Sequence, residues 1–427
     1  MVARRPQPHA QDARRAGLTA SAAKPRLSLL LAAFGDPGHA FPAIALGKEL
    51  AARGHDVCLQ TWRKWSEHVE REGMRFEPAP EYEVFPREGS ALKPYQAAVR
   101  AAEETVPLIR ELDPQAVVAD ILTTAAALAA GMESRPWATL VPHVLPAGEP
   151  GFPLYSVGAR YPRTALGRAL WRLLDPIEDI GARQGRRELN EARRRVGLPP
   201  FEHLHGGTSR QLALIATFPQ LEYPRRRWEP WMRVTGPLMW EQPYGDTDLP
   251  PGDDPLVLVA PSTSQDPKQR MLRAALEGLA GEPVRVLGTT NRREPAEQLE
   301  IPPNARLVDW VSYSRTMPHC DAVVCHGGHG TVVRALAYGV PVVACPAAGD
   351  MAENAARIAW SGVGVALPRR LASARGVRAA VRRLLGDESF ARRAAELAGW
   401  ARSHDGAAIA ADEVERFASG RPPSGGA

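Results

Sequence analysis

The feature that most constrains the fold is an apolar run that leads directly into a glycine-rich turn, between residues 322 and 331. The run Ala-Val-Val-Cys contains no charged residue, which is typical of a strand in a parallel sheet that is covered on both faces. The turn His-Gly-Gly-His-Gly-Thr follows, and the next residues predict a helix over 332–338 that ends at Gly339. Strand, turn and helix in this order predict a βα unit of an α/β fold.

The same turn has the properties of an anion site. Glycines let backbone N–H groups approach a ligand closely, and a helix N-terminus carries unpaired donors and a partial positive charge. His326 supplies a further donor at this place. The turn is neither a Walker loop, because no lysine follows the glycines, nor a G-x-G-x-x-G fingerprint. The alternative is a structural turn that binds no ligand.

Two flanking runs strengthen the pattern: Val-Asp-Trp-Val around Trp310, and Gly-Asp-Met-Ala-Glu-Asn around Asp350. With these flanks the sequence resembles the family 1 glycosyltransferases of the GT-B fold, of the bacterial natural-product type. Their donor-binding signature runs W-V-P-Q, then H-x-G-x-G-T/S, G-V-P and D-Q-x-x-N. The resemblance extends over nearly the whole chain after residue 24.

The resemblance implies an α/β architecture of two facing Rossmann-like domains, with parallel sheets and a C-terminal helix that crosses back to the N-terminal domain. A chain of 427 residues is long for one core and suits two. We therefore expect an acceptor-binding domain over 25–238, a linker rich in Pro, Gly and Asp over 239–255, and a nucleotide-sugar-binding domain over 256–405. A returning helix at 406–419 and disordered tails at 1–24 and 420–427 complete this division.

Composition excludes several other classes of protein. Hydrophobic residues make up 44% and charged residues 24%, as in ordinary globular domains. The net charge of +5 gives no reason to expect a nucleic-acid partner, and the longest apolar run near the start, 27–34, is too short to span a membrane. The four cysteines form no C-x-x-C pair, which indicates buried free thiols in a reducing cytoplasm. We expect a cytoplasmic protein with small-molecule partners; its oligomeric state is left open.

The N-terminal half predicts a parallel sheet with two titratable residues at its ligand-binding edge. Apolar strands at 27–32, 56–61, 116–119, 138–141 and 211–217 alternate with helices, the first of them at 40–53. Ligands of such sheets bind at the carboxyl ends of strands. His39 follows the first strand and Asp120 a later one. A carboxylate bound to one imidazole nitrogen leaves the other free as a general base. A structural or solvated histidine is the alternative.

The resemblance assigns roles to these and to further positions. Gly38, His39 and Pro42 match G-H-x-x-P, whose histidine is the catalytic base, and Asp120 matches the aspartate that completes the dyad. Donor binding is implied for Trp310 and the backbone of Val311 at the base; for His326, Gly328, Gly330, Thr331, Ser262 and Thr263 at the diphosphate; and for Asp350 and Met351 at the sugar. A core aromatic is the alternative for Trp310.

The expected co-substrate is a dTDP- or UDP-linked sugar, with no cofactor and no metal. Asp246 and Asp248 form a D-x-D triplet, but the triplet lies in the predicted linker with no strand before it, so solvated carboxylates are expected there. The arginine-rich run 183–195 is likewise predicted to be a solvated helix face. Loops at 77–94 and 142–162 are expected to bind the acceptor.

The chain departs from the family pattern at three places. Ser312 and Tyr313 stand in place of P-Q, a change the sequence does not explain. Arg334 replaces a glutamate that often binds ribose hydroxyls, and Met351 replaces the sugar-binding glutamine. Because an unpaired buried polar group costs about 1–3 kcal/mol, both changes favour a donor with fewer hydroxyls, a dTDP-deoxysugar rather than UDP-glucose.

The predicted activity is inverting transfer of a sugar to a hydroxyl of a small hydrophobic natural product. The alternatives are a silent nucleotide-sugar-binding or activator homologue, which should have lost His39 or Asp120, and a GT-B epimerase or hydrolase, which should gather several carboxylates around the sugar.

Overall fold

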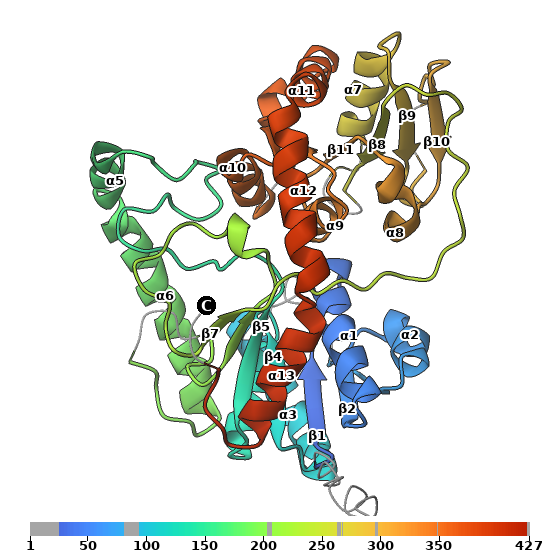
Figure 1. Cartoon of the computed structure of the whole chain (residues 1–427). Coiled ribbons are helices and arrows are strands. Elements are labelled where there is room, and N and C mark those ends of the chain that lie inside the picture. The colour runs from blue at the N-terminus through green and yellow to red at the C-terminus, as the bar shows by residue number, and fades with distance from the viewer. Residues whose placement is uncertain are drawn as a thin grey trace, which may run out of the picture.

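The computed structural model describes residues 25–80, 94–202, 207–262, 266, 268–294, 298–347 and 349–424 (Figure 1). These residues form two parallel α/β sheets, each with its own helices. The first half of the predicted C-terminal tail is among them, and the backbone N–H of Ser424 donates to Glu413 Oε2 at 3.2 Å.

The first sheet has seven parallel strands in the order β3-β2-β1-β4-β5-β6-β7. They are β1 (Ser28–Ala32), β2 (Asp56–Thr61), β3 (Arg75–Pro78), β4 (Ala116–Asp120), β5 (Trp137–Val141), β6 (Ala213–Ile215) and β7 (Met232–Val234). Helix α1 (Pro37–Ala52) packs on one face, and α3 (Pro94–Leu112), α4 (Thr124–Met132) and α6 (Asp175–Arg195) lie on the other. The shorter helices are α2 (Ser66–Arg71) and α5 (Ala165–Arg172).

The second sheet has six parallel strands in the order β10-β9-β8-β11-β12-β13. They are β8 (Leu256–Ala260), β9 (Arg285–Thr289), β10 (Ala305–Val308), β11 (Ala322–Cys325), β12 (Val342–Ala344) and β13 (Gly364–Ala366). One face is covered by α9 (His329–Ala337), α10 (Met351–Ser361) and α12 (Glu388–Ser403), and the other by α7 (Arg270–Leu279) and α11 (Ala374–Gly386). A single helical turn, α8 (Tyr313–Thr316), precedes β11.

The last helix, α13 (Gly406–Ala418), belongs in space to the first sheet, as predicted. Its apolar residues Ala410, Ala411 and Val414 are buried in the same core as β1 and α1. Figure 1 shows α12 and α13 running in succession from the second sheet down onto the first. Arg53 at the end of α1 contacts Glu415 Oε1 at 3.1 Å, so the crossing is held by charge as well as by packing.

Residues of the first domain also enter the core of the second. Val144, Phe218 and Leu221 are at most 2% exposed, and they pack with residues of β8, β11 and α9. The Phe218 ring contacts Trp400 edge-on, with centroids 5.7 Å apart. The two domains therefore meet through a dry apolar contact, in addition to the linker and α13.

Two sequence expectations on burial can be compared with the structure. Cys58, Cys325 and Cys345 are buried free thiols, as predicted, and Cys320 is partly exposed. The arginine-rich helix is exposed along most of its length, but the expectation is wrong for Arg193. Its guanidinium is buried, because it stacks 3.7 Å from the Phe201 ring centroid and donates to Pro199 O. Over the described ranges, no helix is both long and apolar enough to cross a bilayer.

Candidate active site

Both sheets place candidate residues where their strand order reverses. In the first sheet β1 lies beside β4, so His39 and Asp120 follow neighbouring strands. In the second sheet β8 lies beside β11, so Ser262 and His326 follow neighbouring strands. Such reversal points leave a crevice at the carboxyl ends of the strands, where open α/β sheets bind ligands.

His39 lies in the first turn of α1, not in the loop where the sequence placed it. Asp36 caps the helix by accepting the backbone N–H of His39 at 3.0 Å, and Pro37 has the fixed φ that suits the first helical position. The helix therefore begins three residues earlier than predicted, and it holds the His39 ring over the end of β4.

The His39 ring is bound to Asp120. Nδ1 of His39 lies 2.7 Å from Asp120 Oδ2, and Asp120 Oδ1 accepts the N–H of Leu122 at 2.8 Å. Burial lowers the pKa of His39, but the hydrogen bond and charge of Asp120 more than offset this, so the pKa lies above its ordinary value. Asp120 thus fixes Nδ1–H as the donor and leaves Nε2 as the basic nitrogen.

His143, which follows β5, is a neighbour that the sequence did not single out. Its ring centroid lies 6.1 Å from that of His39, nearly perpendicular to it. Its Nδ1 lies 2.7 Å from Val144 O, and a carbonyl accepts only, so Nδ1 carries the proton and Nε2 is an acceptor. Burial lowers the pKa of His143, which favours the neutral ring. In the sequence, the only signal for His143 was its position just after a predicted parallel strand.

The glycine turn begins α9 at His329, so Gly330 and Thr331 lie in the first turn of the helix rather than before it. The His326 ring lies over Gly328, where a Cβ would fall 2.3 Å from Nε2; only glycine fits beneath the ring. Gly327 has a φ of +80°, and its carbonyl accepts Asn354 Nδ2 at 2.9 Å. The turn therefore directs the open N-terminus of α9 and His326 to one place.

The charge of Asp350, on the second domain, acts on histidines of both domains. Asp350 is the residue before α10, and its side chain does not cap that helix. Burial lowers the pKa values of His143 and His326, while the charge of Asp350 acts on both in the opposite direction. The same charge helps to raise the pKa of His39. Asp350 therefore lies within electrostatic range of His39.

Trp310, expected at the nucleotide base, is half-buried, and the Arg292 guanidinium lies 4.7 Å from its ring centroid. Val311 beside it is 4% exposed and belongs to the core of the second domain. Ser262 is buried after β8. Thr263 lies outside the described residues, as does 81–93, most of one predicted acceptor loop.

Two of the three departures from the family pattern have structural partners. Ser312 Oγ donates to Glu241 Oε1 at 2.7 Å, and the same carboxylate accepts the N–H of Tyr313 at 3.1 Å. Ser312 and Tyr313 therefore fasten α8 to the linker. Arg334 is buried, and it donates to Gly330 O at 2.8 Å and to the carbonyl of Trp240. Arg334 thus ties the turn to the linker and offers no acceptor to a ribose.

The carboxylates of the D-x-D triplet lie beside arginines. Asp246 Oδ1 is 2.6 Å from Arg315 Nη1, and Asp248 Oδ2 is 3.6 Å from Arg306 Nη1. Both aspartates are exposed, at 83% and 95% of their side chains. In the part of the chain that the structure describes, no group of three or more His, Cys, Asp or Glu could hold a metal ion.

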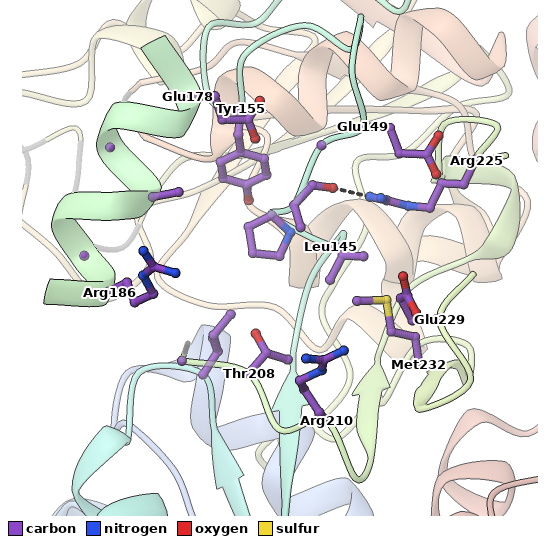
Figure 2. A pocket seen from close by; sticks show the side chains of 18 of the residues that line it. Leu145, Glu149, Tyr155, Glu178, Arg186, Thr208, Arg210, Arg225, Glu229 and Met232 are labelled. Carbon is purple, nitrogen blue, oxygen red and sulfur yellow. Dashed lines mark hydrogen bonds between the residues drawn. The ribbon is translucent and has the colours of Figure 1, made fainter. Parts of the chain in front are cut away.

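A cavity of about 820 Å³ lies in the first domain between α6 and the loops within residues 145–155, 207–210 and 225–232 (Figure 2). Gly181, Ala182 and Gly185 of α6 line one side, and Figure 2 shows Arg225, Glu229 and Met232 on the opposite side. Ile121, which follows Asp120, and Leu145, two residues after His143, also line it. Its size suits a drug-sized ligand.

Comparison with known proteins identifies the family. Residues 29–136 match the glycosyltransferase family 28 N-terminal domain, and residues 275–414 match the erythromycin biosynthesis protein CIII-like C-terminal domain. The 4'-demethylrebeccamycin synthase of Lentzea aerocolonigenes is 31% identical over 423 residues, covering 91% of this chain and 98% of the relative. The chain belongs to the family 1 glycosyltransferases of the GT-B fold.

A further relative and two solved structures also match this glycosyltransferase over most of its length. O-mycaminosyltylonolide 6-deoxyallosyltransferase of Streptomyces fradiae is 29% identical over 431 residues, covering 92% of this chain and 98% of the relative. The glycosyltransferase of kitacinnamycin matches with a TM-score of 0.71 at 22% identity, over 92% of this chain and 99% of that one. The glycosyltransferase VinC in complex with dTDP matches with a TM-score of 0.64 at 20% identity, over 92% and 99%. The structural matches support the GT-B fold.

Proposed function

We propose that this glycosyltransferase inverts the sugar that it transfers, and that His39 is the general base. The observation that carries the proposal is the 2.7 Å contact between His39 Nδ1 and Asp120 Oδ2, at a strand edge within electrostatic range of Asp350 of the other domain. A base at this place lies between a sugar held at Asp350 and an acceptor in the cavity beside Ile121.

The proposed step is a single displacement. His39 Nε2 takes the proton of the acceptor hydroxyl, the oxygen forms a bond to the anomeric carbon, and the bond from that carbon to the diphosphate oxygen breaks. The proton stays on His39, where the charge of Asp120 stabilises the imidazolium. Attack from the side opposite the leaving group inverts the anomeric centre. His143 Nε2, an acceptor beside His39, suits a hydroxyl of the acceptor or the sugar.

The departing diphosphate gains negative charge as the bond breaks. The open N-terminus of α9 offers hydrogen bonds at that place, without a metal ion. His326 Nδ1 lies 3.4 Å from Ala260 O, so the one N–H of its neutral ring is directed to that carbonyl. Preorganised donors of this kind stabilise the developing charge, because they need no rearrangement during the step.

A dTDP-linked deoxysugar is the proposed donor. Arg334 is occupied with Gly330 O and the Trp240 carbonyl, and Met351 brings a thioether where the family has an amide. Neither side chain accepts a hydrogen bond from an additional hydroxyl. One relative is a 6-deoxyallosyltransferase, and one structural neighbour was solved with dTDP, which supports the same choice.

The proposed acceptor is a small hydrophobic natural product in the cavity of Figure 2. Its lining includes the apolar residues Ile121, Leu145 and Leu154. The glycines of α6 leave room there for a bulky ligand: a Cβ at Gly181 or Gly185 would find no atom within 4 Å.

Calorimetric binding of dTDP and UDP, first without metal and then with magnesium, tests the proposal. We expect tighter binding of dTDP and no effect of magnesium. Tighter binding of UDP would leave the transferase but reject the donor assignment, and a requirement for magnesium would reject the metal-free site. If neither nucleotide binds, the donor site itself is wrong.

A further inference from the structure

A buried ion pair crosses the domain interface. Arg357 of α10 and Glu222, just after the turn Pro219–Leu221 of the first domain, have side chains that are each 3% exposed, and Nη1 lies 3.0 Å from Oε2. Arg357 Nη1 also donates to Leu221 O at 2.9 Å, and Nε donates to Glu353 Oε1 at 2.8 Å. The guanidinium lies 4.2 Å from the ring centroid of Tyr223. One side chain of the second domain thus holds three groups of the first.

Each end of this pair leads to a different part of the candidate site. On the first domain, the other oxygen of Glu222 accepts the N–H of Leu145 at 2.7 Å, and Leu145 lines the cavity two residues after His143. On the second domain, α10 begins directly after Asp350, and its Asn354 donates to the carbonyl of Gly327 in the turn. The pair therefore joins the loop at the acceptor cavity to the helix at the donor turn.

The pair is stable only with the domains together. A charge removed from water loses several kcal/mol of hydration, and only a well-placed partner compensates for this. Glu222 finds that partner on the opposite domain, whereas Arg357 also has Glu353 on its own helix. Separation of α10 from the loop breaks the contact with Glu222 and leaves that carboxylate without its cation, so the arrangement favours one relative position of the domains over its neighbours.

We propose that Arg357 is a positioning residue for sugar transfer: its ion pair with Glu222 fixes the loop of His143 and Leu145 against the donor-binding end of α10. Asp350, His143 and the acceptor cavity then hold one geometry around His39. The proposal rests on the proposed donor and acceptor sites. It adds that the donor-binding end of α10 and the acceptor loop are coupled through this pair.

Hydrogen exchange tests the coupling without knowledge of the acceptor. dTDP-glucose and UDP-glucose are the probes, and the one that binds tighter by calorimetry is used at saturation. Amides in residues 142–157 are then measured with and without it. In the unaltered enzyme we expect these amides to exchange about three-fold or more slowly with the probe bound. In Arg357→Met we expect the probe still to bind and this difference to vanish.

Graded variants separate positioning from mere stability. Glu222→Gln keeps an acceptor for Leu145 N–H but removes the charge, and Arg357→Lys keeps the charge but cannot span Glu222 and Glu353 together. Both variants should retain part of the slowing of amide exchange that the probe causes in residues 142–157. They test the positioning role if Arg357→Met does not fold. A purely structural role predicts faster exchange in the free and bound states alike, with the difference between them unchanged.

The matched control is Arg382→Met, which breaks the exposed Arg382–Glu282 pair on the outer face of the same domain. It should leave the coupling intact. If neither nucleotide sugar binds the unaltered enzyme, the proposed donor site fails and the coupling with it. If the probe binds but the loop shows no added protection, or if Arg357→Met keeps all of it, only the positioning role is overturned.

Discussion

Nε2 of His329, the first residue of α9, lies 3.2 Å from the carbonyl oxygen of Ala216 in the first domain. The carbonyl accepts only, so Nε2 carries a proton. The candidate diphosphate helix is thus bonded at its N-terminus to the opposite domain. Burial is the main cause that lowers the pKa of His329 to about 3.

The first prediction concerns the pH dependence of stability. The unfolded chain binds a proton at an ordinary histidine pKa of about 6.5, whereas folded His329 does not. Between pH 6.5 and 3 the unfolded state therefore binds more protons, and stability falls as the pH falls. His329→Gln should remove a loss of ~1.4 kcal/mol per pH unit in this window. Urea unfolding at pH 7 and pH 4.5 measures it, with the exposed His319→Gln as the control. Equal slopes in the unaltered protein and His329→Gln would contradict the assignment.

The second prediction concerns the base. The pKa of His39 is raised, so kcat/KM should increase with pH through an apparent pKa above about 6.5. Asp120→Asn removes the charge that offsets the effect of burial on the pKa of His39. The rise of kcat/KM with pH should therefore move to lower pH. Its plateau should also fall about 100- to 1,000-fold, because the imidazolium loses its partner. A pH–rate profile on the best donor distinguishes the two effects. An Asp120→Asn enzyme in which this rise does not move would reject His39 as the titrating base.

The third prediction concerns Trp310. Arg292 covers one face of its ring at 4.7 Å, so a nucleotide base stacks on the other face or displaces the arginine. Trp310→Ala should weaken nucleotide binding about five- to 100-fold, in line with ~1–3 kcal/mol for base stacking on an aromatic ring. Trp310→Phe should retain most of the affinity, and Arg292→Ala should tighten binding if the arginine competes. Calorimetry with dTDP measures the nucleotide affinity of each variant. An unchanged affinity in Trp310→Ala would mean that Trp310 has a structural role only.

The elements of the fold were largely predictable, because buried parallel strands are continuous apolar runs. Strand β2 has the predicted bounds, and the contact between His39 and Asp120 followed from the rule that strand ends meet at one edge. The helix starts were less accurate. At α1 a cap by Asp36 and at α9 the turn itself draw earlier residues into the helix.

The contacts between the domains could not be predicted from the sequence. Nothing in the local pattern of Glu222, Arg357 or Glu241 distinguishes a buried partner from a solvated charge, because the partner lies on the other domain or on the linker. His143 is of the same kind, since its proximity to His39 depends on the order of β4 and β5. The replacement of P-Q by Ser312 and Tyr313 gained an explanation only through the linker carboxylate.

The last prediction concerns the cavity beside α6. Gly185 lines it in the middle of α6, and a Cβ there would meet no atom within 4 Å. Leucine forms helix more readily than glycine by up to about 1 kcal/mol, so Gly185→Leu should fold as well as the unaltered enzyme or better. Its side chain enters the cavity and should weaken binding of an apolar dye, N-phenyl-1-naphthylamine, about ten-fold or more, since it occupies space the ligand needs. Affinity for dTDP should not change. Gly386→Leu, at the equally open end of α11, is the control. If Gly185→Leu binds the dye and turns over acceptors as before, the acceptor lies elsewhere in the cleft.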